Sequence, residues 1–141
     1  MSHPAATAGE EWIVEALGCH PGRLGDVQVL QSLFEVMVRE LALNPVGAPL
    51  WHRFPGAGGV TGMLMLSESH LTIHTFPEHA SACLNLFCCT PRAAWAWDVR
   101  LRALLGAERV DVRLVRRSYA ALGTAVTAMH ASAVAPATVS P

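Results

Sequence analysis

Charge is scarce in this sequence, and neither sign dominates. Charged residues make up 15% of the 141 positions, and the formal net charge is −1 with histidine neutral. A protein that grips a nucleic-acid backbone needs a basic patch. The chain has only a short basic cluster at 113–117 (RLVRR). Its arginines alternate with apolar residues, which is typical of a strand with one solvent-exposed face. We therefore expect no nucleic-acid partner.

Long apolar runs and paired cysteines are also absent. No run reaches the roughly 20 residues that span a bilayer, and the start MSHPAATAGEEW lacks the basic-then-apolar order of a signal peptide. We therefore expect a cytoplasmic protein with no membrane partner. The four cysteines, Cys19, Cys83, Cys88 and Cys89, include no CxxC pair, so free thiols are expected in that reducing compartment.

Hydrophobic residues, at 52%, are enough for a packed core in one domain. Asp26 is a suitable N-cap for a helix over 27–43 that Asn44-Pro45 ends, and Pro91 opens a second helix over 91–105 with Gly106 as its stop. Strand-like runs lie at 12–17, 49–54, 60–66, 69–76, 81–88 and 109–117.

This order predicts an α+β fold, a two-layer α/β sandwich in which an antiparallel sheet carries two main helices on one face. We expect a single domain over 1–118 that begins with a disordered lead at 1–9 and is followed by an Ala-rich flexible tail at 119–141.

The stretch 67–78, SESHLTIHTFPE, concentrates the chemistry of the chain. Period two puts His70 and His74 on one strand face, as in a metal site, but Pro77 interrupts the path to a third histidine, so no metal is predicted. A hydrolase would use Ser69 with His74, but no G-x-S-x-G elbow is present. An ordinary half-buried strand explains the alternation, yet not two histidines beside a Glu-Ser pair.

Self-processing is the fourth interpretation of this stretch. A serine hydroxyl can attack the carbonyl carbon of the preceding residue, and a base can then remove the serine Cα proton, which breaks the chain and leaves a pyruvoyl group. Glu68 would be the acyl donor, Ser69 the nucleophile and His74 the base. Donors that stabilise the tetrahedral intermediate are also required. Ser67 is interpreted as an ordinary strand residue.

The same residues resemble the prokaryotic S-adenosylmethionine decarboxylase proenzyme family, which depends on a pyruvoyl group. The family signature ESHLTIHTWPE is similar to residues 68–78, and its cysteine-ended strand is similar to NLFCC at 85–89. GVTG at 59–62 resembles the family's GVSG, and EALGCHPGRLGD resembles its N-terminal turn. The likeness covers roughly 12–118.

The resemblance implies cleavage between Glu68 and Ser69, giving a β chain of 1–68 and an α chain that starts at residue 69. Ser69 would become the pyruvoyl cofactor that forms a Schiff base with the substrate amine and serves as an electron sink. His74 would take the serine Cα proton during processing, and Thr61, in place of a serine, would support it. Cys89 would be the proton donor in decarboxylation.

The resemblance also implies the partners. Glu78 would bind the ribose hydroxyls of S-adenosylmethionine and Phe54 would stack on its adenine, with decarboxylated S-adenosylmethionine and carbon dioxide as products for spermidine biosynthesis. The processed protomers of the family pair as (αβ)₂, so a homodimer is expected.

The chain departs from the family pattern near the expected substrate pocket. Phe76 occupies the position of the family's tryptophan, Asn85 that of an aspartate and Thr90 that of a glycine. The extra methyl group of Thr61 is expected to slow processing. Two alternatives therefore stay open: a pyruvoyl decarboxylase of ornithine or arginine, and a catalytically silent homologue that pairs with an active partner. An activator such as putrescine is also left open. Cys88 is interpreted as a small core residue on the opposite strand face from Cys89.

Overall fold

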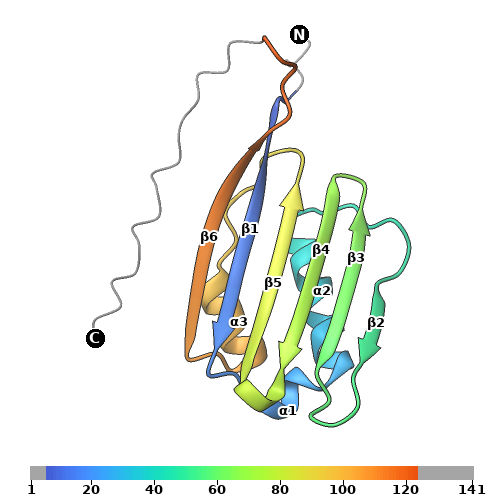
Figure 1. The fold of residues 1–141 in the computed structure, drawn as a ribbon, viewed down its shortest axis with the longest axis vertical. Helices are drawn as coiled ribbons and strands as arrows, with labels where there is room; N and C mark the ends of the chain where they lie inside the picture. The colour runs from blue at the N-terminus through green and yellow to red at the C-terminus, as the bar shows by residue number, and fades with distance from the viewer. Residues whose placement is uncertain (1–5, 124–141) are drawn as a thin grey trace.

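Alternating apolar residues place six strands side by side in one antiparallel sheet within residues 6–123, the part that the computed structural model describes (Figure 1). The strand order is β2-β3-β4-β5-β1-β6, so β1 lies between two strands from the second half of the chain. The strands are β1 (Ala8–Leu17), β2 (Leu50–Arg53), β3 (Val60–Leu66), β4 (Ser69–Phe76), β5 (Ser81–Cys88) and β6 (Arg109–Ser118).

The helices lie on one face of this sheet (Figure 1). They are α1 (Pro21–Leu24), α2 (Val27–Glu40) and α3 (Trp97–Leu105), and a 3₁₀ turn, η1 (Pro77–His79), joins β4 to β5. The predicted α+β sandwich is therefore confirmed. No helix in the described part of the chain is long and apolar enough to cross a membrane.

Helix α2 begins at the residue that the sequence predicts, but it ends earlier than predicted. The Asp26 carboxylate accepts from the backbone N–H of Gln28 at 2.9 Å, which is the predicted N-cap. The helix ends at Glu40 rather than at residue 43. Ala42 takes a left-handed φ of 50°, which turns the chain away before Asn44-Pro45 is reached.

The second main helix begins later than predicted. Residues 91–96 form no helix, and α3 starts at Trp97. The Trp95 indole N–H donates to the Glu40 carboxylate at 2.6 Å, and the Trp95 and Trp97 rings pack edge to face at 4.9 Å. These tertiary contacts fix an irregular segment where propensity alone favours helix. The predicted stop is correct, because Gly106 ends α3 with a φ of 72°.

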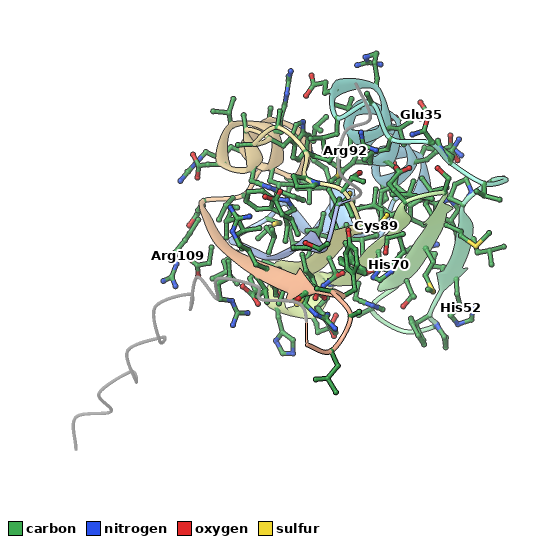
Figure 2. All side chains as sticks on the ribbon, turned by 90° about the horizontal axis from the view of Figure 1, so that it is seen from above. Glu35, His52, His70, Cys89, Arg92 and Arg109 are labelled. Atoms are coloured by element: carbon green, nitrogen blue, oxygen red, sulfur yellow. The ribbon has the colours of Figure 1, made fainter. Side chains whose placement is uncertain are left out.

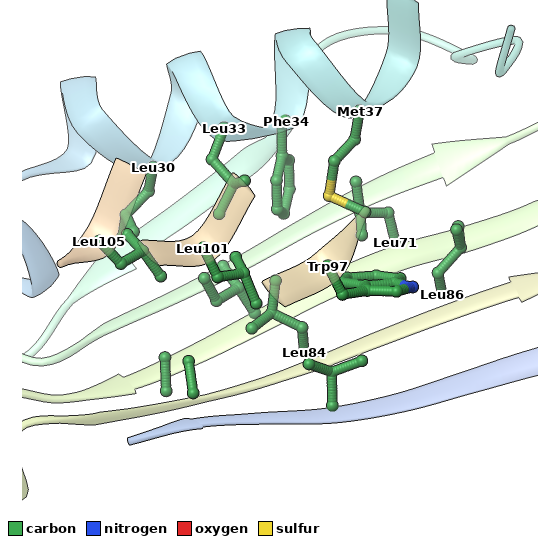
Figure 3. Close-up of a cluster of buried hydrophobic side chains, with 14 of the residues drawn as sticks. Leu30, Leu33, Phe34, Met37, Leu71, Leu84, Leu86, Trp97, Leu101 and Leu105 are labelled. Carbon is green, nitrogen blue, oxygen red and sulfur yellow. The ribbon is translucent and has the colours of Figure 1, made fainter. Parts of the chain in front are cut away.

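The core fills the space between the helices and the sheet (Figure 3). Its residues come from the inward face of α2, from α3 and from alternate positions of the central strands. Those labelled in Figure 3 are Leu30, Leu33, Phe34, Met37, Leu71, Leu84, Leu86, Trp97, Leu101 and Leu105. Thr75 joins the layers, because its hydroxyl donates to the Leu24 carbonyl at 2.7 Å and accepts from the Val60 N–H at 2.9 Å.

The opposite face of the sheet, which we call the open face, has no helix over it in the described residues (Figure 1). It nevertheless exposes large apolar side chains. Leu50 is 77% exposed, Met65 59% and Met63 51%, all on β2 and β3. Exposed apolar side chains gathered on one face are common at interaction surfaces.

The ends of the described chain differ from the expected domain limits. β1 already begins at Ala8, inside the lead that was expected to be disordered. Tyr119, the first residue of the expected tail, donates its hydroxyl to the backbone carbonyls of Ala8, at 3.2 Å, and of Cys89. The rest of the predicted tail from residue 124, and residues 1–5 of the lead, lie outside the described residues.

Candidate active site

The Glu68–Ser69 peptide bond lies at the tip of the hairpin between β3 and β4. Leu66 and Ser69 are the last paired residues, and Ser67 and Glu68 form the two-residue turn between them. Breaking the chain at a hairpin tip leaves the flanking strands paired with their neighbours. The bond predicted to be cut is therefore at a position where the fold tolerates a cut.

The backbone of Cys89 reaches this bond from the neighbouring strand. Ser69 pairs with Cys88 in the register of β4 and β5, and the Cys89 N–H donates to the Glu68 carbonyl oxygen at 2.9 Å. Cys88 is 1% exposed on the helix side, so the interpretation of Cys88 as a core residue is confirmed. The N–H of Cys89 thus polarises the carbonyl group that a serine nucleophile would attack.

The Glu68 side chain is buried and held by three hydrogen bonds. Asn44 donates from its backbone N–H to Oε1 at 3.0 Å and from Nδ2 to Oε2 at 3.2 Å, and the Ser67 hydroxyl donates to Oε2 at 2.8 Å. Burial raises the pKa of Glu68, but the bonds from Asn44 and Ser67 outweigh it, so the net pKa is lowered. The interpretation of Ser67 as a strand residue is wrong, because Ser67 lies in the turn.

Arg92 adds a cation to this end of the site. Its Nη2 atom lies 3.6 Å from Glu68 Oε1. Burial raises the pKa of the Cys88 thiol, while a hydrogen bond from Arg92 opposes that rise. Arg92 therefore lies between the turn and the buried thiol, on the helix side of Cys89 as Figure 2 also shows.

A second cluster of predicted residues lies at the other end of β3 and β4. Thr61 and His74 are cross-strand partners, and Thr61 Oγ1 is 3.2 Å from His74 Nδ1. Both line a cavity of about 380 Å³ together with Phe54, Phe76 and Glu78. The hydroxyl of Thr61 thus contacts His74, and Glu78 and Phe54, the residues predicted to bind the ribose and the adenine, open onto the same cavity.

The two clusters are far apart within one chain. Ser69 and His74 lie five positions apart on one strand, which at about 3.3 Å per residue separates their Cα atoms by roughly 16 Å. The His74 ring cannot span that distance to the serine of its own chain. The structure therefore brings Glu68, Ser69 and Cys89 together at one end, and Thr61, His74, Phe54 and Glu78 at the other.

The histidine that contacts Ser69 is His70, which the sequence reasoning did not assign. Ser69 Oγ lies 3.4 Å from His70 Nδ1, and His70 Nε2 lies 3.1 Å from Asn85 Oδ1. Figure 2 shows His70 and Cys89 near each other on the sheet. The sequence did contain a signal for this contact. The predicted strands 69–76 and 81–88 form a hairpin, which puts His70 and Asn85 on the same face of adjacent strands.

Metal coordination finds no support in the geometry. Within residues 6–123, no group of three or more His, Cys, Asp or Glu side chains is arranged to hold a metal ion. The alternating arginines of β6 bind carboxylates of β1: Arg113 contacts Glu15 and Arg117 contacts Glu11, each at 2.6 Å.

The sheet order and the one-sided helices define a class of α+β sandwich that solved structures share. The crystal structure of the adenosylmethionine decarboxylase from Aquifex aeolicus superposes with a TM-score of 0.70 at 24% identity, over 84% of this chain and 97% of that one. At that identity the likeness establishes the fold alone. A family sequence model described as S-adenosylmethionine decarboxylase matches residues 10–118, so the chain belongs to that family.

Relatives in bacteria and archaea agree with this assignment. The S-adenosylmethionine decarboxylase proenzyme of Symbiobacterium thermophilum is 36% identical over 113 residues, which cover 79% of this chain and 83% of that protein. The proenzyme of Shouchella clausii is 36% identical over 60% of this chain, and that of Pyrococcus horikoshii 33% over 62%. The match spans only 64% and 61% of the length of these two relatives.

Proposed function

We propose that the chain cleaves itself between Glu68 and Ser69, and that the processed protein decarboxylates S-adenosylmethionine through a pyruvoyl group derived from Ser69. The observation that carries the proposal is the 2.9 Å hydrogen bond from the Cys89 N–H to the Glu68 carbonyl oxygen. It joins the two separated parts of the family motif at the bond to be cut. Family membership and the relatives named as proenzymes support the same activity.

Cleavage would begin with an acyl shift. Ser69 Oγ attacks the Glu68 carbonyl carbon, and the oxygen that gains charge stays bonded to the Cys89 N–H. One such donor is worth about 10²–10³ in rate where it has been removed from an oxyanion hole. Collapse breaks the C–N bond and leaves an ester between Glu68 and the Ser69 side chain.

Elimination would then cut the chain. A base removes the Ser69 Cα proton, the Cβ–Oγ bond breaks, and Glu68 departs as a carboxylate at the end of the β chain. Water replaces the nitrogen of the remaining dehydroalanine, ammonia leaves, and the α chain begins with a pyruvoyl group.

The residues present fit such a group. The Ser69 hydroxyl, the polarised carbonyl of Glu68 and the thiol-bearing Cys89 meet at one hairpin tip. A pyruvoyl group supplies an electron sink for the charge left when carbon dioxide departs. The Cys89 thiol would return a proton to the substrate α carbon, because Cys89 follows Cys88, the strand partner of Ser69, and its backbone N–H is bonded to Glu68.

A second protomer would complete the site. Since His74 is roughly 16 Å along the strand from Ser69, a His74 that serves as the base for elimination has to belong to another chain. In a twofold-symmetric dimer, a contact of residue i with residue j also places j against i, so two open faces that stack would form two sites at once. Each would combine Ser69 and Cys89 of one protomer with His74 and Glu78 of the other.

The apolar character of the open face supports this pairing. Besides the exposed residues of β2 and β3, Phe54 is 51% exposed and Phe76 38% exposed at the rim of the His74 cavity. Burial of apolar surface stabilises an interface by about 25 cal/mol per Å². We therefore propose a homodimer in which the uncovered sheets face each other.

The substrate would be held at the His74 end. The Glu78 carboxylate can accept two hydroxyl hydrogen bonds, as a ribose diol requires, and Phe54 offers a ring face for a purine within the same cavity. A carboxylate could also pair with the side-chain cation of ornithine or arginine, but Phe54 would then have no purine to stack on. The cavity that Glu78 and Phe54 share therefore favours a nucleoside-bearing substrate over a simple amino acid.

Two measurements test the proposal. Intact mass of the purified protein should give a 1–68 fragment and a 69–141 fragment lighter by one ammonia than simple hydrolysis would give. An uncleaved chain after long incubation would rule out both pyruvoyl activities and favour the silent homologue. Carbon dioxide release from labelled S-adenosylmethionine, ornithine and arginine, with and without putrescine, then identifies the substrate.

A further inference from the structure

A chain of polar contacts runs from the Ser69 hydroxyl on β4 across β5 and β1 to Arg117 on β6. Beyond the contacts of His70 with Ser69 at 3.4 Å and with Asn85 at 3.1 Å, Asn85 Nδ2 donates to Glu11 Oε1 at 2.9 Å. The other Glu11 oxygen accepts from Arg117 at 2.6 Å. The serine to be consumed is thus the first member of an ordered relay.

The far end of the relay fixes the direction of every hydrogen bond. The bond from Asn85 and the bond from Arg117 together lower the pKa of Glu11, so this carboxylate is charged and can only accept. The Asn85 NH₂ group must therefore face Glu11, and its oxygen must face His70. An amide oxygen accepts, so His70 Nε2 carries the proton, and the lone pair of Nδ1 faces the Ser69 hydroxyl.

Packing holds the imidazole in this orientation. The Phe87 ring lies at 6.0 Å from the His70 ring with an interplanar angle of 63°, and Phe87 is the cross-strand partner of His70. The Arg117 guanidinium covers Phe87 at 5.6 Å. The arginine that neutralises Glu11 therefore also supports the ring that borders His70.

We propose that His70 is the general base that takes the Ser69 hydroxyl proton in the acyl shift, with Asn85 as its positioning residue. The inference rests on the proposed self-cleavage. As the proton moves from Oγ to Nδ1, Oγ forms its bond to the Glu68 carbonyl carbon and the carbonyl π pair moves to the oxygen held by Cys89. On collapse the C–N bond breaks, and the same proton passes from Nδ1 to the Ser69 nitrogen, so no net charge is left.

This assignment divides the two proton transfers of processing between two histidines. His70 acts within its own chain on the hydroxyl proton, whereas His74 is placed to act later on the Cα proton of the other protomer. Loss of His70 should therefore stop the reaction at the intact amide. Loss of His74 should stop it at the ester, which hydroxylamine cleaves.

Asn85 places no charge beside the His70 ring. The charged groups that face His70 are Glu11 on β1, which lies beyond Asn85, and Arg117 on β6, which is paired to Glu11. On β3 the partner of His70 is Met65, which carries no charge. A neutral amide at position 85 leaves Nδ1 free to accept a proton, while an aspartate there would hold the imidazole in its charged form to higher pH.

The test follows cleavage of freshly translated full-length chains by intact mass over time. We expect His70→Gln to slow cleavage at least about 100-fold and to accumulate precursor that hydroxylamine does not cut. The control is His79→Gln, an exposed histidine in η1, which should cleave like the wild type. Wild-type cleavage of His70→Gln would overturn the assignment while leaving self-cleavage standing, and an uncleaved wild type would overturn both.

A second variant keeps the proposal testable if His70→Gln fails to fold, which thermal melting would reveal. Asn85→Asp retains the shape of the side chain. We expect the pH at which cleavage reaches half its maximal rate to rise by about one unit, since the charged imidazole must first lose its proton. An unshifted pH profile for Asn85→Asp would overturn the positioning role.

Discussion

The backbone N–H of Cys89, just after β5, donates to the carbonyl oxygen of Glu68, in the turn before β4, at 2.9 Å. After the proposed cleavage the two residues would belong to different chains. A backbone donor does not depend on the side chain that carries it. The position of Cys89 therefore combines two functions that substitution can separate, one in processing and one in decarboxylation.

Replacing Cys89 with alanine should separate these functions. The N–H remains, so cleavage between residues 68 and 69 should proceed at a rate close to that of the wild type. The thiol is lost, so kcat for carbon dioxide release should fall about 10²–10⁴-fold, the usual contribution of a positioned proton donor. Intact mass and the labelled-substrate assay measure the two effects on one preparation. A Cys89→Ala protein that stays uncleaved would contradict the backbone role.

Mixing two inactive variants should restore cleavage if the site is shared between protomers. Ser69→Ala keeps His74 but has no nucleophile, and His74→Ala keeps Ser69 but has no base. Each alone should fail to produce a pyruvoyl chain. In a mixed dimer one of the two sites is complete, so only the His74→Ala chains should be cut, and at most half of all chains. If co-refolding gives no cut chains, the two-protomer site is wrong.

Stability of the precursor should fall in acid through Glu68. Its pKa is lowered in the folded state, so its stabilising contribution is present above the ordinary pKa near 4.5 and is lost as pH falls through the lower folded value. Urea unfolding from pH 7 to pH 3 in the uncleavable Ser69→Ala background would detect this loss. Adding Glu68→Gln should flatten that part of the curve, and an unchanged curve would show that Glu68 is not its source.

Thr75→Val should destabilise the fold. The valine methyl group cannot accept from the Val60 N–H or donate to the Leu24 carbonyl, so both buried groups lose this partner. We expect a loss of about 1–3 kcal/mol in the free energy of unfolding, again in the Ser69→Ala background. Thr72→Val, on the other face of the same strand, is the matched control and should change stability by less than about 0.5 kcal/mol.

Local patterns predicted most of the fold, and tertiary contacts explain the exceptions. β4 and β5 follow from alternation, and the start of α2 follows from Asp26. Propensity also favoured a helix from Pro91, but the buried Trp95 and its bond to Glu40 keep that segment irregular. Local sequence cannot predict this contact, because Glu40 lies in α2, far from Trp95 along the chain.

In the candidate site too, some residues could be predicted from local sequence and others depend on tertiary contacts. The motif indicated Ser69, His74 and Cys89, and the strand rise could already have shown that Ser69 and His74 are too far apart in one chain. The roles of Asn44 and Arg92 at Glu68 depend on loops whose path no periodicity predicts. His70 was not predicted for another reason: the family resemblance assigns a processing role to His74, the second histidine of the stretch, and none to His70.

The position of β1 between β5 and β6 has a consequence for timing. Residues 1–68 contain β1, β2 and β3, but both neighbours of β1 and the β4 partner of β3 lie after the cut. The first fragment therefore cannot assemble this sheet by itself, and the Cys89 amide reaches Glu68 only when β5 has paired with β4. Cleavage therefore requires a completed fold, and a chain that misfolds or is truncated keeps its serine. In a correctly folded chain, three strand pairings hold the two fragments together after the cut, β1 with β5, β1 with β6 and β3 with β4.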